Sequence, residues 1–289
     1  MTAASNRFQV ASDVSPDEQQ RLACTEFERL ANALRDSGVE VIVAIDLPEP
    51  HMPDAIFPNN WVSFHADGKV VLYPMEAENR RVERRMDVIE SLVAEPGFRV
   101  DEIVDLTGHE QRGHYLEGTG SMVLDRANRI AYACLSTRTH LDPLGDFAQR
   151  LDYDVVAFDA VDRNGVPIYH TNVLMSIGEE LAVICDTTIA RDDQRTAVLN
   201  RLIESGHDIL SINSEQLNAF AGNMLELRNS DDDRLIVMSQ RAYDSLNQQQ
   251  LQRLDDNGKI LAVDIDNIEQ LGGGSVRCML AEIHLPRSG

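Results

Sequence analysis

A cysteine, a histidine and a glutamate stand out as side chains that could do chemistry together. Cys278 closes the stretch Gly-Gly-Gly-Ser-Val-Arg-Cys at 272–278. Consecutive glycines open backbone conformations that other residues avoid. The cation of Arg277 would favour the thiolate, which is the nucleophilic form of cysteine. The pattern indicates a reactive cysteine at the mouth of a strand, and an inert cysteine in a core strand is the alternative.

Composition limits the class of protein. The chain has 289 residues, of which 43% are hydrophobic and 26% charged, so we expect a globular fold. It lacks an apolar run of roughly 18 residues that could span a membrane, and its start lacks the hydrophobic segment of a signal peptide, so a cytoplasmic location is expected. Four cysteines without C-x-x-C pairs or nearby histidine clusters predict neither disulfides nor a zinc site.

The charge balance bears on partners. A formal net charge of -22 would repel nucleic acid and anionic membranes, so neither is expected as a partner. Lys69 and Lys259 are the only lysines. An acid-rich, lysine-poor surface suits solubility at high salt, and an ordinary solvated surface is the alternative.

Periodicity predicts a repeated unit of two strands, a helix and a further strand. Ser15-Pro16 opens a helix that ends near Gly38, and a strand is expected at Val39–Ile45. The first unit is expected to have a strand at Val70–Tyr73, a helix at 80–93 and a strand near 104. The second should have strands at Tyr115–Leu124 and Ile130–Leu135, a helix at Pro143–Leu151 and a strand at Val155–Phe158. The third and fourth should have paired strands within 169–185 and from 220–230 to Leu235–Ser239, helices at Asp192–Ser205 and Gln248–Asp256, and closing strands at Ile209–Ile212 and Ile260–Ile265.

Four copies of roughly fifty residues indicate a repeat architecture. We expect a fifth copy to take its strand from Val276–Leu285 and its helix and closing strand from Ser15–Ile45. This would close a ring and make residues 1–289 a single domain.

The copies share a cluster of polar or reactive residues where the first strand of each begins. Glu117, His170 and Cys278 occupy such positions, and so do three asparagines, Asn60, Asn172 and Asn223. A lone histidine or glutamate at a strand start is more often structural. If the units surround one axis, however, the clusters converge, and a cysteine, a histidine and a carboxylate in one cleft supply a nucleophile, a proton carrier and a group that orients it.

These motifs carry a family resemblance. Asp54-x-x-Phe57, Leu-Glu-Gly at 116–118, His170 and the Gly-Gly-Gly-x-x-Arg-Cys stretch resemble the guanidine-modifying superfamily, or penteins, over nearly the whole chain. That superfamily includes arginine deiminase, dimethylarginine dimethylaminohydrolase and the amidinotransferases. The chain looks most similar to an arginine-deiminase-related group proposed to be citrulline-utilisation hydrolases. The resemblance implies an α/β fold, a five-bladed propeller of pseudo-fivefold ββαβ repeats.

The resemblance also implies roles for individual residues. Cys278 would attack the central carbon of a guanidino or ureido group, His170 would move protons and Glu117 would hold the histidine. Asp54, Phe57, Asn60, Arg138 and Asn172 would bind the substrate, with Arg138 gripping its α-carboxylate. Arg80 and Arg81 lie near the place of a second such arginine but are better explained as surface charge. No metal or cofactor is implied, and a homo-oligomer is left open.

Asn60 and Asn172 stand where relatives that bind a guanidinium usually have aspartates, which leaves Asp54 and Glu117 as the expected acids of the pocket. An amide cannot neutralise a cation but can pair with a ureido group. Citrulline hydrolysis to ornithine, ammonia and carbon dioxide is therefore the predicted function. Arginine deimination or dimethylarginine hydrolysis is the alternative, and a non-catalytic binding protein of the superfamily is another. Relatives would also have a strand upstream of residues 2–9.

Overall fold

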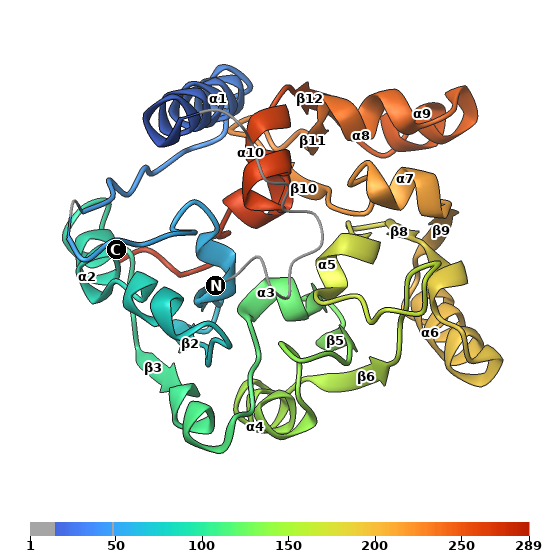
Figure 1. Cartoon of the computed structure of the whole chain (residues 1–289), viewed down its shortest axis with the longest axis horizontal. Helices are drawn as coiled ribbons and strands as arrows, with labels where there is room; N and C mark the ends of the chain where they lie inside the picture. The colour runs from blue at the N-terminus through green and yellow to red at the C-terminus, as the bar shows by residue number, and fades with distance from the viewer. Residues whose placement is uncertain (1–14, 48, 289) are drawn as a thin grey trace.

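The computed structural model describes residues 15–47 and 49–288. Within them, four three-stranded sheets follow one another around a common centre (Figure 1). Each sheet has strands in chain order, the first pair antiparallel and the second parallel. The strands are β1 Val62–Phe64, β2 Lys69–Leu72, β3 Glu102–Asp105, β4 Val123–Asp125, β5 Ile130–Cys134, β6 Asp154–Phe158, β7 Met175–Ile177, β8 Leu181–Ile184, β9 Asp208–Ser211, β10 Leu225–Arg228, β11 Arg234–Ser239 and β12 Lys259–Val263.

A helix joins the second and third strand of every sheet, as a parallel pair requires. These helices are α2 Met86–Ala94, α4 Leu141–Leu151, α6 Asp192–Glu204 and α9 Gln248–Asp255, the last preceded by α8 Gln240–Ser245. In α4, Leu144, Phe147 and Leu151 recur at helical spacing and are buried. The four predicted repeats are confirmed, although the helix expected at 80–93 is divided into a 3₁₀ turn, η3 (Glu78–Glu83), and α2.

The prediction of strands for the fifth copy is wrong. Helix α1 (Pro16–Asp36) forms as predicted, with the Ser15 hydroxyl accepting from the Glu18 amide, and it packs on α10 (Asp266–Gly272) and β12. Residues 39–45 form no strand, and Ile45 is 80% exposed. An extended segment becomes a strand only when its backbone groups pair with a neighbour. The upstream strand expected near residues 2–9 lies outside the described residues.

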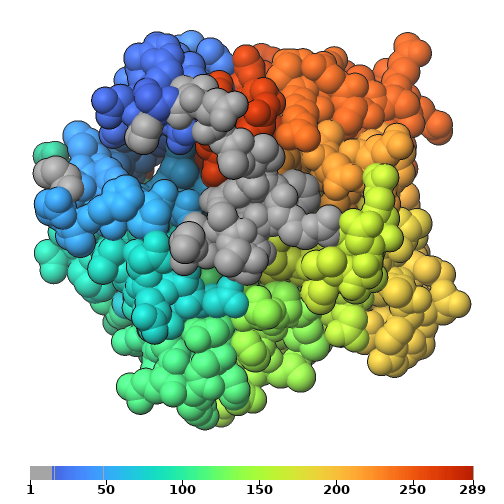
Figure 2. Space-filling view, viewed as in Figure 1, coloured from blue at the N-terminus to red at the C-terminus, as the bar shows by residue number. Residues whose placement is uncertain are grey.

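The C-terminal segment likewise differs from the predicted strand. Val276–Met279 is a 3₁₀ turn, η6, and the chain then runs extended until it meets residues 97–99. There the Arg99 amide donates to the Pro286 carbonyl, and the Ser288 amide donates to the Gly97 carbonyl. In Figure 2 red spheres from the C-terminal part of the chain lie beside the blue spheres of its first helix, and α10 contacts α1, so the last α-helix of the described chain packs on the first.

Short helical turns replace the start of the predicted first strands. They are η2 Pro58–Asn60, α3 Gly118–Ser121 and α5 Thr171–Leu174, and η6 is the corresponding turn before the C-terminal segment. The strand expected at Tyr115–Leu124 therefore shrinks to β4. Gly118 shows why: its φ is +49°, and a Cβ there would lie 2.1 Å from the Asn59 carbonyl oxygen, so α3 and η2 meet backbone to backbone. The remaining elements are η4 Thr107–Arg112, η5 Asp186–Thr188 and α7 Ser214–Asn218.

These turns face the centre of the molecule, where α3, α5 and α10 surround the middle of the view in Figure 1. Turn α3 contacts both η2 and α5, and η2 contacts η6. The fold therefore brings polar residues from four separate segments together in a buried interior. No helix of the described residues has the length and apolar character to cross a membrane.

Candidate active site

Glu117 and His170 form a buried pair between two repeats. Each residue directly precedes a central turn, Glu117 before α3 and His170 before α5. His170 Nε2 lies 2.9 Å from Glu117 Oε2. Gly120 makes room for the imidazole, because a Cβ at that position would lie 2.8 Å from its Nδ1 and Cε1 atoms. The sequence predicted that these two residues lie close together, and the structure confirms it.

Glu117 is fully buried and is held as a carboxylate. Its Oε2 also accepts from Arg138 Nη1 at 3.2 Å, and its Oε1 accepts from the Glu76 amide at 3.0 Å. Burial by itself would raise the pKa of Glu117, but Arg138 and His170 outweigh burial and hold that pKa well below its usual range.

Burial lowers the pKa of His170, against the opposing influence of Glu117. The imidazole is thus neutral at neutral pH and able to accept a proton.

Cys278 lies in η6 and is buried, with its sulfur facing amide groups. Asn172 Nδ2 lies 3.3 Å from Sγ, and Asn223 Nδ2 lies 3.4 Å from it. Hydrogen bonds from such donors favour a thiolate over a thiol. The Asn223 side chain also accepts from the Arg277 amide at 3.0 Å. Asn223 therefore contacts both the sulfur of Cys278 and the backbone of η6. The alignment of the repeats had placed Asn223 in this centre.

The expected contribution of the Arg277 cation is wrong. Its guanidinium donates to the Leu280 carbonyl at 3.0 Å and pairs with Glu282 at 2.8 Å. A charge satisfied in this way offers the thiolate little help. The side-chain amides of two asparagines, and not the arginine, contact the sulfur.

The glycines before Cys278 accommodate Phe57. A Cβ at Gly272 or at Gly274 would lie 2.8 Å or 2.9 Å from the Phe57 ring, and Gly273 ends α10 with a φ of +66°. The Tyr169 hydroxyl donates to the Gly273 carbonyl at 2.7 Å. The triple glycine therefore permits close packing beneath the nucleophile, and a substrate-binding role for Phe57 stays a prediction.

Arg80 contradicts the interpretation as surface charge, because it is only 2% exposed. Its guanidinium pairs with Glu83 at 2.8 Å and with Asp54 at 3.5 Å, and it donates to Asn60 Oδ1 at 3.0 Å. Arg80 thereby fixes two of the predicted substrate-binding side chains, Asp54 and Asn60. The sequence did not predict the burial of Arg80, because a short segment rich in charged residues is usually exposed to solvent.

Arg81 and Arg138 are also engaged in ion pairs. Arg81 lies 3.3 Å from Glu110. Arg138 is buried, pairs with Glu117 and Glu76 at 3.2 Å each, and lies over the Tyr169 ring. The role predicted for Arg138, binding the α-carboxylate of the substrate, stays a prediction. In the structure the Arg138 guanidinium forms ion pairs with two glutamates.

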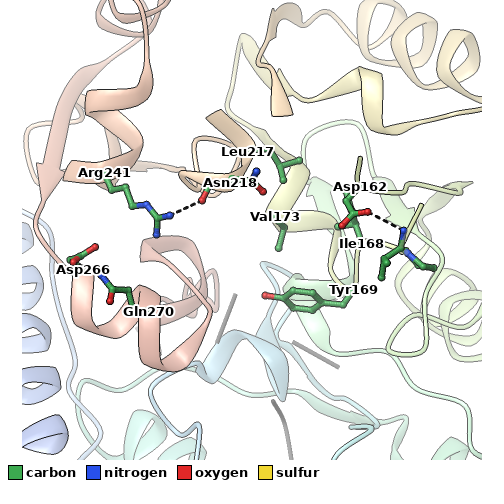
Figure 3. A pocket seen from close by; sticks show the side chains of 11 residues that line it. Asp162, Ile168, Tyr169, Val173, Leu217, Asn218, Arg241, Asp266 and Gln270 are labelled. Carbon is green, nitrogen blue, oxygen red and sulfur yellow. Dashed lines mark hydrogen bonds between the residues drawn. The ribbon is translucent and has the colours of Figure 1, made fainter. Parts of the chain in front are cut away.

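A cavity of about 560 Å³ lies beside this centre, between α7, α8 and α10 (Figure 3). Tyr169 and Val173, which flank His170 and Asn172 in sequence, form one wall, and Arg241, Asp266 and Gln270 form another. Its volume is in the range of small-molecule sites. In the part of the chain that the structure describes, no three His, Cys, Asp or Glu side chains form a group that could hold a metal ion.

Comparison with known proteins identifies the family. Residues 1–285 match the family model described as N,N dimethylarginine dimethylhydrolase, eukaryotic. The chain belongs to this family. No curated protein matches it at the sequence level.

Several solved structures have a similar fold. Apo ArgZ, an arginine dihydrolase from the ornithine-ammonia cycle in cyanobacteria, is 19% identical with a TM-score of 0.68, and the match covers 93% of this chain but only 38% of ArgZ. Unliganded AgrE is 18% identical with a TM-score of 0.71, covering 93% of this chain and 36% of AgrE. A histidine-to-glycine variant of dimethylarginine dimethylaminohydrolase, as its adduct with S-methyl-L-thiocitrulline, is 15% identical with a TM-score of 0.61, covering 99% and 95%.

The predicted membership of the pentein superfamily is therefore confirmed, and the fold is of the mixed α/β kind with small sheets. The family that residues 1–285 match is named for a hydrolase. This name favours the predicted enzyme over the alternative of a non-catalytic binding protein.

Proposed function

We propose that this protein hydrolyses the guanidino group of arginine or a closely related amino acid. The charge of the buried centre carries the proposal. Among the described residues, four acidic groups, from Asp54, Glu76, Glu83 and Glu117, surround two guanidinium groups, from Arg80 and Arg138, so acidic groups are in excess there. Such an excess offsets the desolvation of a substrate cation. The expectation that Asp54 and Glu117 are the only acids was wrong, because Glu83 and Glu76 join them.

In the proposed mechanism, His170 carries the protons. The Cys278 thiolate attacks the central carbon, and the C–S bond forms while the carbon acquires tetrahedral geometry. His170 takes up a proton from solvent and gives it to the departing nitrogen, which leaves as ammonia or an amine. His170 then takes a proton from water as the water oxygen attacks the same carbon, and the C–S bond breaks to regenerate the thiolate. Glu117 stabilises the imidazolium whenever it forms.

A second candidate is hydrolysis of citrulline, which the asparagines favour. Among the described residues, Asn172 Oδ1 is buried and has no hydrogen-bond partner. It can accept an N–H from a ureido group as well as from a guanidinium. ArgZ is named an arginine dihydrolase, and two successive hydrolyses at one site would make the ureido compound an intermediate that yields ornithine, ammonia and carbon dioxide.

Product analysis separates these candidates. The protein is incubated separately with arginine, dimethylarginine and citrulline, and ornithine, citrulline and ammonia are quantified by mass spectrometry over time. We expect arginine to be consumed with a higher kcat/KM than citrulline. Consumption of citrulline alone would replace the first candidate with the second, and turnover of neither guanidino nor ureido compounds would refute both.

A double substitution tests the asparagines directly. Asn60→Asp with Asn172→Asp adds two carboxylates and should move the kcat/KM ratio toward arginine and away from citrulline by about tenfold or more. The matched control, Asn59→Asp, changes the neighbouring buried side chain, which accepts from Asn60 Nδ2 at 3.1 Å. An unchanged ratio in the double variant would show that the asparagines do not set specificity.

We also infer that α1, α10 and the C-terminal segment form the fifth unit of a five-bladed propeller and that residues 1–289 are one domain. The position of these elements between the first and fourth sheets supports this (Figure 1). Limited proteolysis tests it, since a single domain should be cleaved cooperatively and leave no stable fragment that ends within 36–60.

A further inference from the structure

Glu269 is a fully buried carboxyl group that the proposed chemistry does not use. It lies in α10, three residues before the triple glycine ends the helix. Its Oε1 accepts from the Ser275 hydroxyl at 2.5 Å, so the side chain reaches across residues 272–274 to the far side of the loop. A buried carboxyl is costly unless its partners are well placed. The partners of this carboxyl group therefore indicate what it does.

Ser275 connects this carboxyl to the nucleophile. It directly precedes η6, and its carbonyl accepts from the Cys278 amide at 2.9 Å. A displacement of Ser275 would therefore displace the backbone of Cys278. Because the sulfur meets Asn172 and Asn223 at 3.3 Å and 3.4 Å, a small shift of the turn would break both contacts.

A second contact links Glu269 to helix α8. Arg241 Nη1 lies 3.7 Å from Glu269 Oε2, on the wall of the cavity in Figure 3. The carboxyl group thus contacts α8 as well as the residue that precedes η6.

The triple glycine makes such an anchor necessary. The glycines allow the loop to pack closely against Phe57. They also give its backbone more conformational freedom than any other residue would. A loop held only by its own backbone would sample several positions of the sulfur. We propose that Glu269 is a positioning residue, whose hydrogen bond to Ser275 fixes the 272–278 turn so that the Cys278 sulfur stays against the two asparagine amides. The inference rests on the proposed role of Cys278 as nucleophile.

The test compares Glu269→Ala with the conservative variant Glu269→Gln. Glutamine offers an oxygen to the Ser275 hydroxyl in the same place and removes only the negative charge. Glu269→Ala should lower kcat by about 100-fold with KM changed less than about threefold, because a misplaced reacting group costs about that much. Glu269→Gln should restore kcat to within about fivefold of the unaltered protein.

Ser275→Ala removes the same hydrogen bond from the other side. It should reproduce the loss in kcat, and Glu269→Ala combined with Ser275→Ala should cost little more than either alone. Glu26→Ala is the structural control, since Glu26 is a buried carboxyl that accepts from the Asn267 and Ile268 amides at the opposite end of α10. We expect it to lower Tm and leave kcat within about threefold.

The rate at which iodoacetamide alkylates Cys278 provides a readout without substrate. It is followed by peptide mass spectrometry in a Cys24→Ser background, because Cys24 is exposed. Glu269→Ala should shift the pH dependence of alkylation toward higher pH, and Glu26→Ala should not. The inference is overturned if Glu269→Ala only lowers Tm, or if Glu269→Gln loses as much as Glu269→Ala. If no substrate reacted, the proposed function would be refuted. The alkylation rate of Cys278 would still test the positioning role of Glu269, because it needs no substrate.

Discussion

The two sides of the catalytic centre are built from different chemistry. On one side, Glu117 and His170 lie among ion pairs, and the carboxylate is contacted by Arg138 and by a backbone amide. On the other, the contacts of the Cys278 sulfur come from the side-chain amides of Asn172 and Asn223. The proposed proton carrier, His170, is thus contacted by charged groups, and the proposed nucleophile, Cys278, is contacted by neutral donors.

The difference follows from what each side must do. An imidazole that accepts and returns a proton needs a fixed counter-charge to stabilise its cation. A thiolate that must form a bond to carbon would be too strongly stabilised by a full cation, and weak donors leave it more nucleophilic. The satisfied guanidinium of Arg277 fits this division, since it is directed to Glu282.

The largest expected effect comes from the nucleophile itself. Cys278→Ser should fold but lose roughly 1,000-fold or more in kcat, because a serine hydroxyl held by amides has no dedicated base. Steady-state kinetics with a circular dichroism control checks this. Near-normal activity in the variant would show that the sulfur does not form the covalent bond.

The charged side should behave as a unit. His170→Ala and Glu117→Gln should each lower kcat by about 100-fold or more, and the double variant should be little worse than the poorer single one. A double-mutant cycle on kcat measures this coupling. Small, additive losses would instead assign both residues a structural role.

Arg138 distinguishes support of Glu117 from capture of substrate. Because it pairs with Glu117 at 3.2 Å, Arg138→Ala should lower kcat by about tenfold on arginine and on agmatine, which lacks the α-carboxylate. A rise in KM confined to arginine, with kcat intact, would favour the carboxylate clamp. Kinetics on both substrates at fixed pH separates the two results.

The smallest effect concerns a buried histidine outside the site. Burial lowers the pKa of His65 to about 3, below the value of about 6.5 in an unfolded chain. The unfolded state therefore binds this proton first, so the stability contributed by neutral His65 is lost as the pH falls below about 6.5. At about pH 5 the loss amounts to about 2 kcal/mol. Urea unfolding at neutral pH and at about pH 5 should show this difference, and it should shrink in His65→Gln.

His170 contributes to acid destabilisation in the same direction, since its pKa is also lowered by burial. Glu117 adds a later contribution, because its lowered pKa stabilises the fold above about pH 4.3 and that stability is lost below it. An unfolding free energy that does not change between neutral pH and about pH 5 would contradict the assignment of neutral, buried imidazoles.

The sequence predicted the parts that depend on local pattern. The four repeats follow from helical and strand periodicity, and the contacts of Glu117 with His170 and of Asn172 with Cys278 follow from their equivalent places in those repeats. The turns were missed, because Gly118 and Thr171 read as parts of strands until close backbone approach between repeats is known. Long-range pairing was also invisible, because the burial of Arg80 depends on its contacts with Asp54 and Asn60, which lie more than fifteen residues away in sequence. The pairing of Arg277 with Glu282 is local, but the sequence does not show which way the arginine side chain points.

The separation in sequence of the residues at the centre has a consequence for folding. His170 and Glu117 are 53 positions apart, and Asn172 and Cys278 are 106 apart. Each repeat can form its helix and sheet from local contacts, whereas the centre exists only after the repeats have docked on one another. During refolding, the helical signal in circular dichroism should thus recover before enzymatic turnover. Turnover reports on completed docking, and a chain whose repeats are all formed but undocked would be well structured and inactive.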